Sequence, residues 1–286
     1  MEQTNAFDCP HPPPIPEAPA LDRGDREIVL LAYGYRFLTA EQIGSLTGME
    51  AGELGVRLER LRQNRFLARL RKPVLWEEEA GPWAYALDRV GANLVAAETG
   101  VDRAEVKWSR SRNRVQSLFL QHALSVNDAR VAFTLSAQQH PDHELFAWRQ
   151  GRQIADRVPD PEDGTKLLPL CPDAYLCYRV GARRSHFFLE VDLGTETNRR
   201  FREKVRAYIA YRQSGRFRER YRAYAFRVLT LTTSQKRLAN LRRAAEAAGG
   251  GSMFWFGTLQ AAAHGSVRNT YWQIAGPLNT ISHLWG

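Results

Sequence analysis

The segment Phe187–Asp192 is the strongest constraint on how this chain can fold. It is apolar apart from Glu190 and Asp192, and its alternation is that of a β-strand. In a strand these two acids point to the same face, about 7 Å apart. Two carboxylates on one face of a largely apolar strand repel each other unless a cation or a solvent opening relieves them. The segment therefore predicts a core strand with an acidic site at its end.

An acid and a lysine elsewhere in the second half complete a pattern typical of metal-dependent nucleases. Asp173 follows Pro172 at the entrance of a second strand-like run, and Lys204 lies in a predicted helix. Carboxylates from neighbouring strands can share Mg²⁺ or Mn²⁺, because these hard cations prefer oxygen ligands. A nearby lysine can orient the attacking water or help to deprotonate it. The order predicts Asp173, Glu190 and Lys204 as catalytic residues, and Asp173, Glu190 and Asp192 as metal ligands.

Lys204 is unusual within its own helix, which is predicted over residues 196–213. It shares an inward stripe with aromatic residues such as Tyr208. A lysine among aromatic residues is better explained by a partner carboxylate than by solvent, and its pKa responds to burial, unlike that of arginine. A purely structural ion pair with Glu190 or Asp192 is the alternative to a catalytic role.

Three helices and a β-hairpin are predicted between residues 23 and 100. A capping box, made of Thr39 and Gln42, begins the second helix. The third helix, over residues 51–64, has leucines at i, i+4 and i+7 on its apolar face. Two strand-like runs, 66–70 and 83–87, follow it. This order is that of a winged helix-turn-helix, in which the third helix enters the major groove of duplex DNA.

The predicted recognition helix carries arginines on its other faces. These candidate DNA contacts are Arg57, Arg60, Arg62 and Arg65. The hairpin loop holds the glutamates Glu77, Glu78 and Glu79, which would repel phosphate, so we expect the helix rather than the wing tip to contact DNA. A winged helix used only for protein contacts is the alternative.

Charge favours a polyanionic partner. The 286 residues include 40 Lys and Arg against 31 Asp and Glu, which gives a net charge of +9. Lysine stands only at Lys72, Lys107, Lys166, Lys204 and Lys236. Arginine, which supplies the rest of the positive charge, suits bidentate contacts with phosphate. A genome rich in GC codons would also favour arginine, and net charge bears on partners rather than on fold.

Four segments are predicted along the chain. They are a disordered, proline-rich arm (residues 1–22), the winged helix-turn-helix (23–100), a basic connector (101–114) and a second folded domain (115–286). The connector adds Arg110 and Arg112 to the candidate DNA contacts. The second domain opens with a long helix, 115–137, whose apolar stripe includes His122. That histidine is either a hydrogen-bonded core residue or one that faces the site.

Strands and helices alternate after the long helix. Strands are predicted over 145–149, 174–180, 186–191, 224–231, 253–256 and 270–274, and helices over 196–213 and 234–248. The fold class is therefore α+β or α/β, a winged helix-turn-helix followed by a sheet with helices added to it.

Arginines and aromatic residues are interleaved between Arg199 and Arg222. The aromatic residues of this stretch are Tyr208, Tyr211, Phe217 and Tyr221. The pattern suits a nucleic-acid backbone, single strands included, and it predicts Arg199 and Arg200 as DNA contacts. The alternative is a solvated helix face whose charge is balanced by Glu203 and Glu219.

Cysteine usage and hydropathy indicate a cytoplasmic protein without membrane insertion. Cys171 and Cys177 flank a predicted strand, which would hold them about 20 Å apart, too far for a disulfide. The sequence has no Cys/His spacing typical of zinc and no N-terminal secretory signal. No apolar run approaches the roughly 20 residues of a membrane span.

Together these motifs resemble the replication-relaxation family of plasmids and integrative elements. The residues that carry the resemblance are the winged helix, the long helix with His122, Pro172-Asp173, Phe188–Glu196 and Lys204–Tyr208. The second half, residues 115–286, is similar to the PD-(D/E)XK nuclease fold, the mixed sheet flanked by helices of restriction endonucleases.

The chain departs from the nuclease pattern at two places. Asp192 stands where the pattern has a lysine, and Lys204 could supply the missing ammonium from the following helix. The first core helix offers His122 and Asp128 where many active members have a glutamate. These departures favour a degenerate nuclease scaffold.

The resemblance implies a DNA-binding protein of a plasmid or integrative element that acts in replication, mobilisation or DNA relaxation. One alternative is an active DNA endonuclease or nickase that uses Mg²⁺ or Mn²⁺. Another is a protein-interaction adaptor or transcriptional regulator. The expected partners are double-stranded DNA, single-stranded DNA, and replication or mobilisation proteins. A homodimer is compatible with the sequence, although no dimer seam is evident in it.

Overall fold

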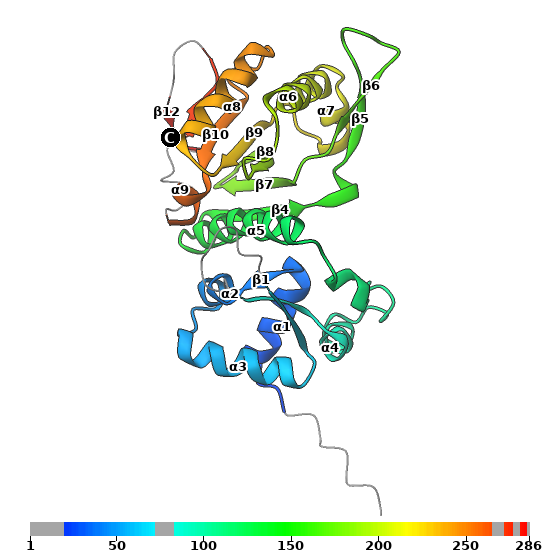
Figure 1. Ribbon diagram of the computed structural model, residues 1–286, viewed down its shortest axis with the longest axis vertical. Helices are drawn as coiled ribbons and strands as arrows, with labels where there is room; N and C mark the ends of the chain where they lie inside the picture. The colour runs from blue at the N-terminus through cyan, green and yellow to red at the C-terminus, as the bar shows by residue number, and fades with distance from the viewer. Residues whose placement is uncertain (1–19, 72–82, 265–271, 277–280, 285–286) are drawn as a thin grey trace, which may run out of the picture.

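The computed structural model describes residues 20–71, 83–264, 272–276 and 281–284 (Figure 1). Nearly all of the predicted proline-rich arm and the loop with Glu77, Glu78 and Glu79 lie outside the described residues. None of the helices in the described ranges is long and apolar enough to cross a membrane.

An N-terminal unit of helices and a small sheet begins the described chain. Its elements are α1 (Arg23–Tyr35), β1 (Leu38–Thr39), α2 (Ala40–Thr47), α3 (Ala51–Gln63), β2 (Leu67–Arg71), β3 (Trp83–Leu87) and α4 (Arg89–Thr99). The strands form an antiparallel sheet in the order β1-β3-β2. The predicted capping box is present: Gln42 N donates to Thr39 Oγ1, and Thr39 N donates to Gln42 Oε1. The leucines predicted for the apolar face of α3 are all buried.

A mixed seven-stranded sheet is the centre of the second half. Its strands are β4 (His143–Arg149), β7 (Ala174–Val180), β8 (Arg183–Asp192), β9 (Arg227–Thr232), β10 (Phe254–Thr258), β11 (Trp272–Ile274) and β12 (Ile281–Ser282). They lie in the order β12-β11-β10-β9-β8-β7-β4. The central strands β8, β9 and β10 are parallel, and the outer pairs are antiparallel.

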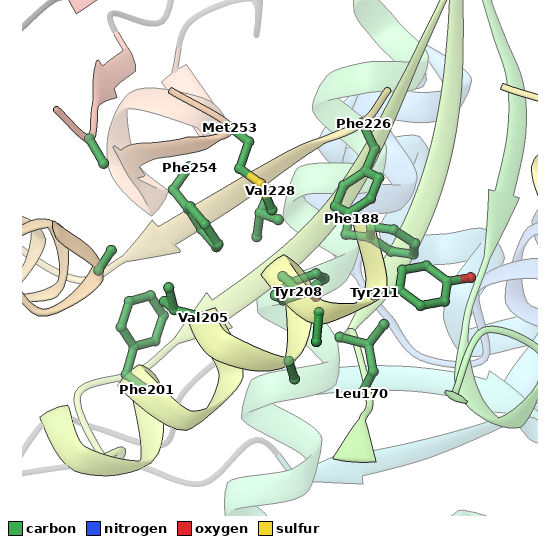
Figure 2. Packing of buried hydrophobic residues seen from close by; sticks show 14 of the residues in the cluster. Leu170, Phe188, Phe201, Val205, Tyr208, Tyr211, Phe226, Val228, Met253 and Phe254 are labelled. Atoms are coloured by element: carbon green, nitrogen blue, oxygen red, sulfur yellow. The ribbon is translucent and has the colours of Figure 1, made fainter. Parts of the chain in front are cut away.

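Helices cover both faces of this sheet, which confirms the predicted mixed α and β architecture (Figure 1). On one face lie α5 (Ser117–Gln138) and α9 (Leu259–His264), and on the other α6 (Asn198–Gln213), α7 (Arg216–Tyr221) and α8 (Gln235–Ala247). Side chains of β8 point alternately to the two faces of the sheet, so this strand contributes to the hydrophobic core on each face. Leu189 packs towards α5. Phe188 packs on the other face, against Tyr208 and Tyr211 of α6 (Figure 2) and against aromatic residues of α7.

Helix α5 also contacts the N-terminal unit. Asn127 Nδ2 donates hydrogen bonds to the carbonyl oxygens of Tyr35 and Phe37, at 3.1 and 2.6 Å. Gln42 Nε2 donates to the carbonyl oxygen of Leu124 at 3.1 Å and to Asp128 Oδ1 at 2.6 Å. These buried bonds join the two halves of the molecule through one helix.

One hairpin is absent from the sequence-based prediction. It pairs β5 (Asp156–Pro159) with β6 (Leu167–Leu170) in a separate two-stranded sheet. The sequence does not suggest strands here, because Pro159 ends β5 and Pro169 lies inside β6, and proline cannot donate a backbone hydrogen bond to a neighbouring strand. A two-stranded sheet consists of edge strands, which tolerate proline.

The prediction that aromatic residues of the 199–222 stretch contact nucleic acid is wrong for three of them. Tyr208, Tyr211 and Phe217 are at most 2 % exposed. Their rings pack around Phe188, and Figure 2 shows this for Tyr208 and Tyr211. Helical periodicity turns these rings towards the sheet and leaves the arginines between them on the outer side.

Candidate functional site

The candidate site lies at the carboxyl end of β8, where Glu190 is 3 % exposed. Lys204 of α6 lies with its Nζ 2.8 Å from Glu190 Oε2. The Tyr208 hydroxyl, also from α6, donates to Glu190 Oε1 at 2.6 Å. Burial raises the pKa of Glu190 to about 7, although Lys204 opposes the shift. Both carboxylate oxygens of Glu190 are therefore engaged by side chains of one helix.

Lys204 has a second carboxylate partner that the sequence did not indicate. Its Nζ lies 3.2 Å from Glu196 Oε2, just before α6. Burial works against the ammonium, but Glu190 and then Glu196 outweigh it and hold the pKa of Lys204 above its usual value. Lys204 thus bridges two acids. Of the two partners predicted for a structural ion pair, Glu190 and Asp192, it is Glu190 that Lys204 contacts, and Glu196 is the second acid.

Asp192 is paired with an arginine from α8. Arg237 Nε lies 2.7 Å from Asp192 Oδ2, and Arg237 Nη2 lies 3.0 Å from Oδ1. The Thr232 hydroxyl and the Gly194 amide also donate to Asp192 Oδ2. Burial alone would raise the pKa of Asp192, but Arg237 outweighs it and the pKa is lowered. Asp192, which we predicted as an additional metal ligand, thus has its own fixed counterion.

Asp173 lies at the entrance of β7, between the sheet and α5. Its Oδ2 accepts a 2.7 Å hydrogen bond from the amide of Val191. It also lies 3.2 Å from Nε2 of His122, which in turn is 3.1 Å from the carbonyl oxygen of Val191. The hydrogen bond with Asp173 raises the pKa of His122. With 35 % of its side chain exposed, His122 faces the site rather than the core.

The structure brings Asp173, Glu190, Lys204 and His122 into one electrostatic neighbourhood. The negative charge of Asp173 contributes to the raised pKa values of both Glu190 and Lys204. However, nowhere in the described residues do three or more His, Cys, Asp or Glu side chains gather in a group that could hold a metal ion. With both oxygens of Glu190 bonded and Asp192 held by Arg237, the residues as arranged do not fit Mg²⁺ or Mn²⁺.

Most of the arginines that we predicted on the recognition helix are engaged in ion pairs. Arg57 Nη1 lies 2.7 Å from Asp22 and 3.1 Å from the fully buried Asp25, and its Nε lies 2.8 Å from Glu53. Arg60 pairs with the same Asp25. These pairs tie α3 to the start of α1, so Arg57 and Arg60 have a structural role in addition to any contact with DNA.

The other two helix arginines differ from each other. Arg62 pairs with Glu59 on its own helix at 2.5 Å. Arg65, just after α3, is 54 % exposed and lies 3.8 Å from Asp88. Arg65 is therefore the most readily available of the four for a phosphate.

The predicted contacts outside α3 are exposed. Arg110 and Arg112 lie in a short 3₁₀ helix of the connector, Arg110–Asn113. Arg36 donates to the carbonyl oxygen of Arg112 at 3.1 Å, and the positive charge of Arg112 adds to burial in lowering the pKa of Arg36. Arg199 and Arg200 of α6 have 85 % and 77 % of their side chains exposed.

Sequence reasoning missed the partners that complete the acidic cluster, namely Tyr208 as a donor, Glu196 and Arg237. One signal was available for Arg237. It is the third residue of the helix that follows β9, the parallel neighbour of β8, so its helix begins at the sheet edge where β8 ends.

Comparison with known proteins gives a match to one protein-family model. The family model described as replication-relaxation matches residues 31–228. Neither the curated proteins nor the solved structures contain a match to this chain. The matched range extends from α1 to β9, through the N-terminal unit and the acidic cluster alike, and covers well over half of the sequence. The chain therefore belongs to the replication-relaxation family, as its motifs predicted.

Proposed function

We propose that the chain is a DNA-binding protein of a plasmid or integrative element that acts in replication, mobilisation or DNA relaxation. In this proposal the N-terminal unit binds duplex DNA as a winged helix-turn-helix. The second domain has the scaffold of a PD-(D/E)XK nuclease but does not cut. Membership of the replication-relaxation family supports the biological setting.

The observation that carries the non-catalytic part is the internal pairing of the acids at the end of β8. Glu190 is held by Lys204 and Tyr208, and Asp192 is held by Arg237. A divalent cation would have to displace these donors from two carboxylates that are nearly closed to solvent. Displacing them would leave Lys204 and Arg237 without a counterion, which is costly in a buried setting.

Two features support duplex binding by the N-terminal unit. Helices α2 and α3 are joined by a short turn with Gly48 in the left-handed region, and the β2–β3 pair follows them. In proteins of this element order, the helix at the position of α3 enters the major groove. Arg65, Arg110 and Arg112 supply exposed positive charge around this unit.

Incubation with supercoiled plasmid and Mg²⁺ or Mn²⁺ separates binding from cleavage. The wild type is compared with Glu190→Gln, and Glu162→Gln serves as a control at an exposed acid outside the cluster. We expect intact plasmid that all three proteins retard equally on a gel. Metal-dependent nicking that is lost only in Glu190→Gln would establish the nuclease alternative instead.

That alternative has one observation in its favour. Asp173 and Glu190 are close enough for the charge of Asp173 to raise the pKa of Glu190, and the side chain of Lys204 reaches Glu190 from α6. If Lys204 and Tyr208 moved off the oxygens of Glu190, the carboxylates of Asp173 and Glu190 could share a cation, with the Lys204 ammonium beside it. The same plasmid experiment decides between the two readings.

Duplex affinity is tested separately with Arg65→Ala and with Arg243→Ala, a charge-matched control on α8. We expect Arg65→Ala to weaken binding and to reduce the slope of log affinity against log salt by about 1, as for the loss of a phosphate contact. Arg243→Ala should leave both nearly unchanged. No binding to duplex DNA by the wild type at low salt would favour the adaptor function.

A further inference from the structure

A pocket of about 280 Å³ lies at the end of the sheet opposite the acidic cluster. Residues that begin β8 and β9 and residues that precede β10 line it, together with Arg212 at the end of α6. Its floor is apolar, because Phe226 and Met253 are buried members of the cluster in Figure 2. Since β8, β9 and β10 are parallel, the acids lie at their carboxyl ends and this pocket at their amino ends.

The lining of this pocket is positively charged. It includes Arg184, Arg212 and Arg227 and has no aspartate or glutamate, and Arg183 directly precedes it in sequence. Within the described part of the chain, no carboxylate lies within ion-pair distance of any of these four guanidinium groups. Other arginines of α6 do have such partners, namely Arg199, Arg200 and Arg206. The pocket therefore concentrates positive charge that the protein does not balance.

The pKa values of two residues in the pocket reflect this excess of positive charge. Burial, and then the charge of Arg183, lower the pKa of Arg227. Burial, and then the charge of Arg184, lower the pKa of His186. Both shifts mean that further positive charge is disfavoured here. A bound anion would relieve the repulsion among the arginines.

Two of the guanidinium groups are held in place by aromatic rings. Arg184 stacks over Phe146 at 4.0 Å, and Arg227 stacks over Trp255 at 4.7 Å. Stacking fixes the plane of a guanidinium and leaves its N–H donors free at the edges, so less rotamer freedom is lost on binding. Hydroxyl groups of Ser185 and Ser252 add further hydrogen-bonding capacity to the lining.

We propose that this pocket binds a backbone phosphate of single-stranded DNA. Several fixed guanidinium groups around one opening match the oxygens of a phosphate. Two exposed aromatic rings adjoin lining residues and suit the bases of a continuous strand: Phe146, which Arg184 contacts, is 49 % exposed, and Tyr224, next in sequence to the pocket residue Ala225, is 79 % exposed. The inference rests on the proposed DNA-binding function and adds a second DNA site to it, distant from α3.

The test is fluorescence anisotropy of the full chain with a labelled oligothymidylate of about 20 nucleotides, a length that spans one or more single-strand sites. The pocket variant is Arg184→Ala with Arg212→Ala. The charge-matched control is Lys236→Ala with Arg243→Ala, two exposed cations of α8 outside the pocket. Circular dichroism melting of each protein verifies that all three are folded to the same degree.

We expect the pocket variant to bind the oligonucleotide at least about tenfold more weakly than the wild type, as for the loss of charge-assisted hydrogen bonds. Its log–log salt slope should fall by about 0.7, because the variant loses one phosphate contact and each single-strand phosphate contact contributes about 0.7. The control should lose less than about twofold in affinity. Equal losses in both variants, or no loss in the pocket variant, would overturn the proposal.

Two further measurements distinguish a single-strand site from a site for free nucleotides and from the duplex site of the N-terminal unit. Competition with ADP distinguishes a free nucleotide from a strand: displacement of the oligonucleotide by ADP at micromolar concentrations would overturn the assignment to a strand. Binding to a duplex of the same length reports on the N-terminal unit. Failure of the wild type to bind the duplex contradicts the proposed function, whereas unchanged duplex affinity in the pocket variant supports a separate site.

Discussion

At the scale of single residues, the acidic cluster shows how a short motif is completed by its surroundings. Glu190 and Asp192 share a face of β8, as alternation requires, but they do not share a cation. Each has its own partner, Lys204 for Glu190 and Arg237 for Asp192. A carboxylate that is nearly closed to solvent is stable as an ion only when its oxygens are satisfied. These two ion pairs therefore satisfy the buried carboxylates in the folded state, and they also occupy the oxygens that a metal ion would need.

Lys204→Met should destabilise the protein by about 3 kcal/mol, because it leaves Glu190 buried without a cation. Arg206 lies on the same helix as Lys204 but forms an exposed ion pair with Glu162 from the β5–β6 connection. Arg206→Met should therefore cost less than about 1 kcal/mol. Urea unfolding of both variants measures the difference. Equal, small effects would mean that the Lys204 pair contributes no more than a surface pair.

His122 should titrate above its ordinary pKa, and Asp173→Asn should lower that pKa, because the hydrogen bond with Asp173 raises it. The pKa of His122 is higher in the folded state than in the unfolded state. The contribution of the His122–Asp173 pair to stability is therefore fully present below the unfolded pKa of about 6.5, and it is lost as pH rises through the folded pKa. NMR titration of the imidazole measures the shift. An unchanged pKa in Asp173→Asn would contradict the pairing.

At the scale of elements, α1 and α3 are linked by a buried charge cluster. Asp25 is fully buried and accepts from both Arg57 and Arg60, while Asp22 accepts from Arg57 as well. Arginines on the predicted recognition helix therefore hold α3 against α1 as well as adding positive charge to the surface. The consequence is that a loss of DNA affinity in an Arg57 variant cannot be interpreted without its stability.

Asp25→Asn should lower the free energy of unfolding by about 3 kcal/mol, because two guanidinium groups lose a buried partner. Arg65→Ala, which removes an exposed arginine, should change it by less than about 0.5 kcal/mol. Thermal unfolding followed by circular dichroism provides both values. A small effect of Asp25→Asn would show that the cluster does not hold α1 against α3.

At the scale of the whole molecule, α5 is shared by two cores. One side packs on the sheet through Phe133 and its neighbours, and the other bonds to the N-terminal unit through Asn127 (Figure 1). A helix in this position couples the N-terminal unit to the domain built on the seven-stranded sheet. Unfolding of the two halves should therefore be linked in the wild type.

Asn127→Ala should cost about 2 kcal/mol, because two backbone carbonyl oxygens lose their buried donor. It should also separate a single calorimetric transition into two, as the halves become independent. Gln138→Ala, at an exposed position near the end of the same helix, is the control. If Asn127→Ala melts in one transition at the wild-type temperature, α5 does not couple the halves through this bond.

The sequence by itself determined the main helices and core strands, though not the β5–β6 hairpin, and the family. Capping at Thr39, the leucine period of α3 and the alternation of β8 are local patterns, and local patterns set local structure. The motif around Glu190 likewise identified the replication-relaxation family. The pairing of charges could not be read in the same way, because the cations come from helices distant in sequence. Packing of α6 and α8 on one face of the sheet brings Lys204 to Glu190 and Arg237 to Asp192. The same packing buries Tyr208 and leaves Arg184, Arg212 and Arg227 together without an acid.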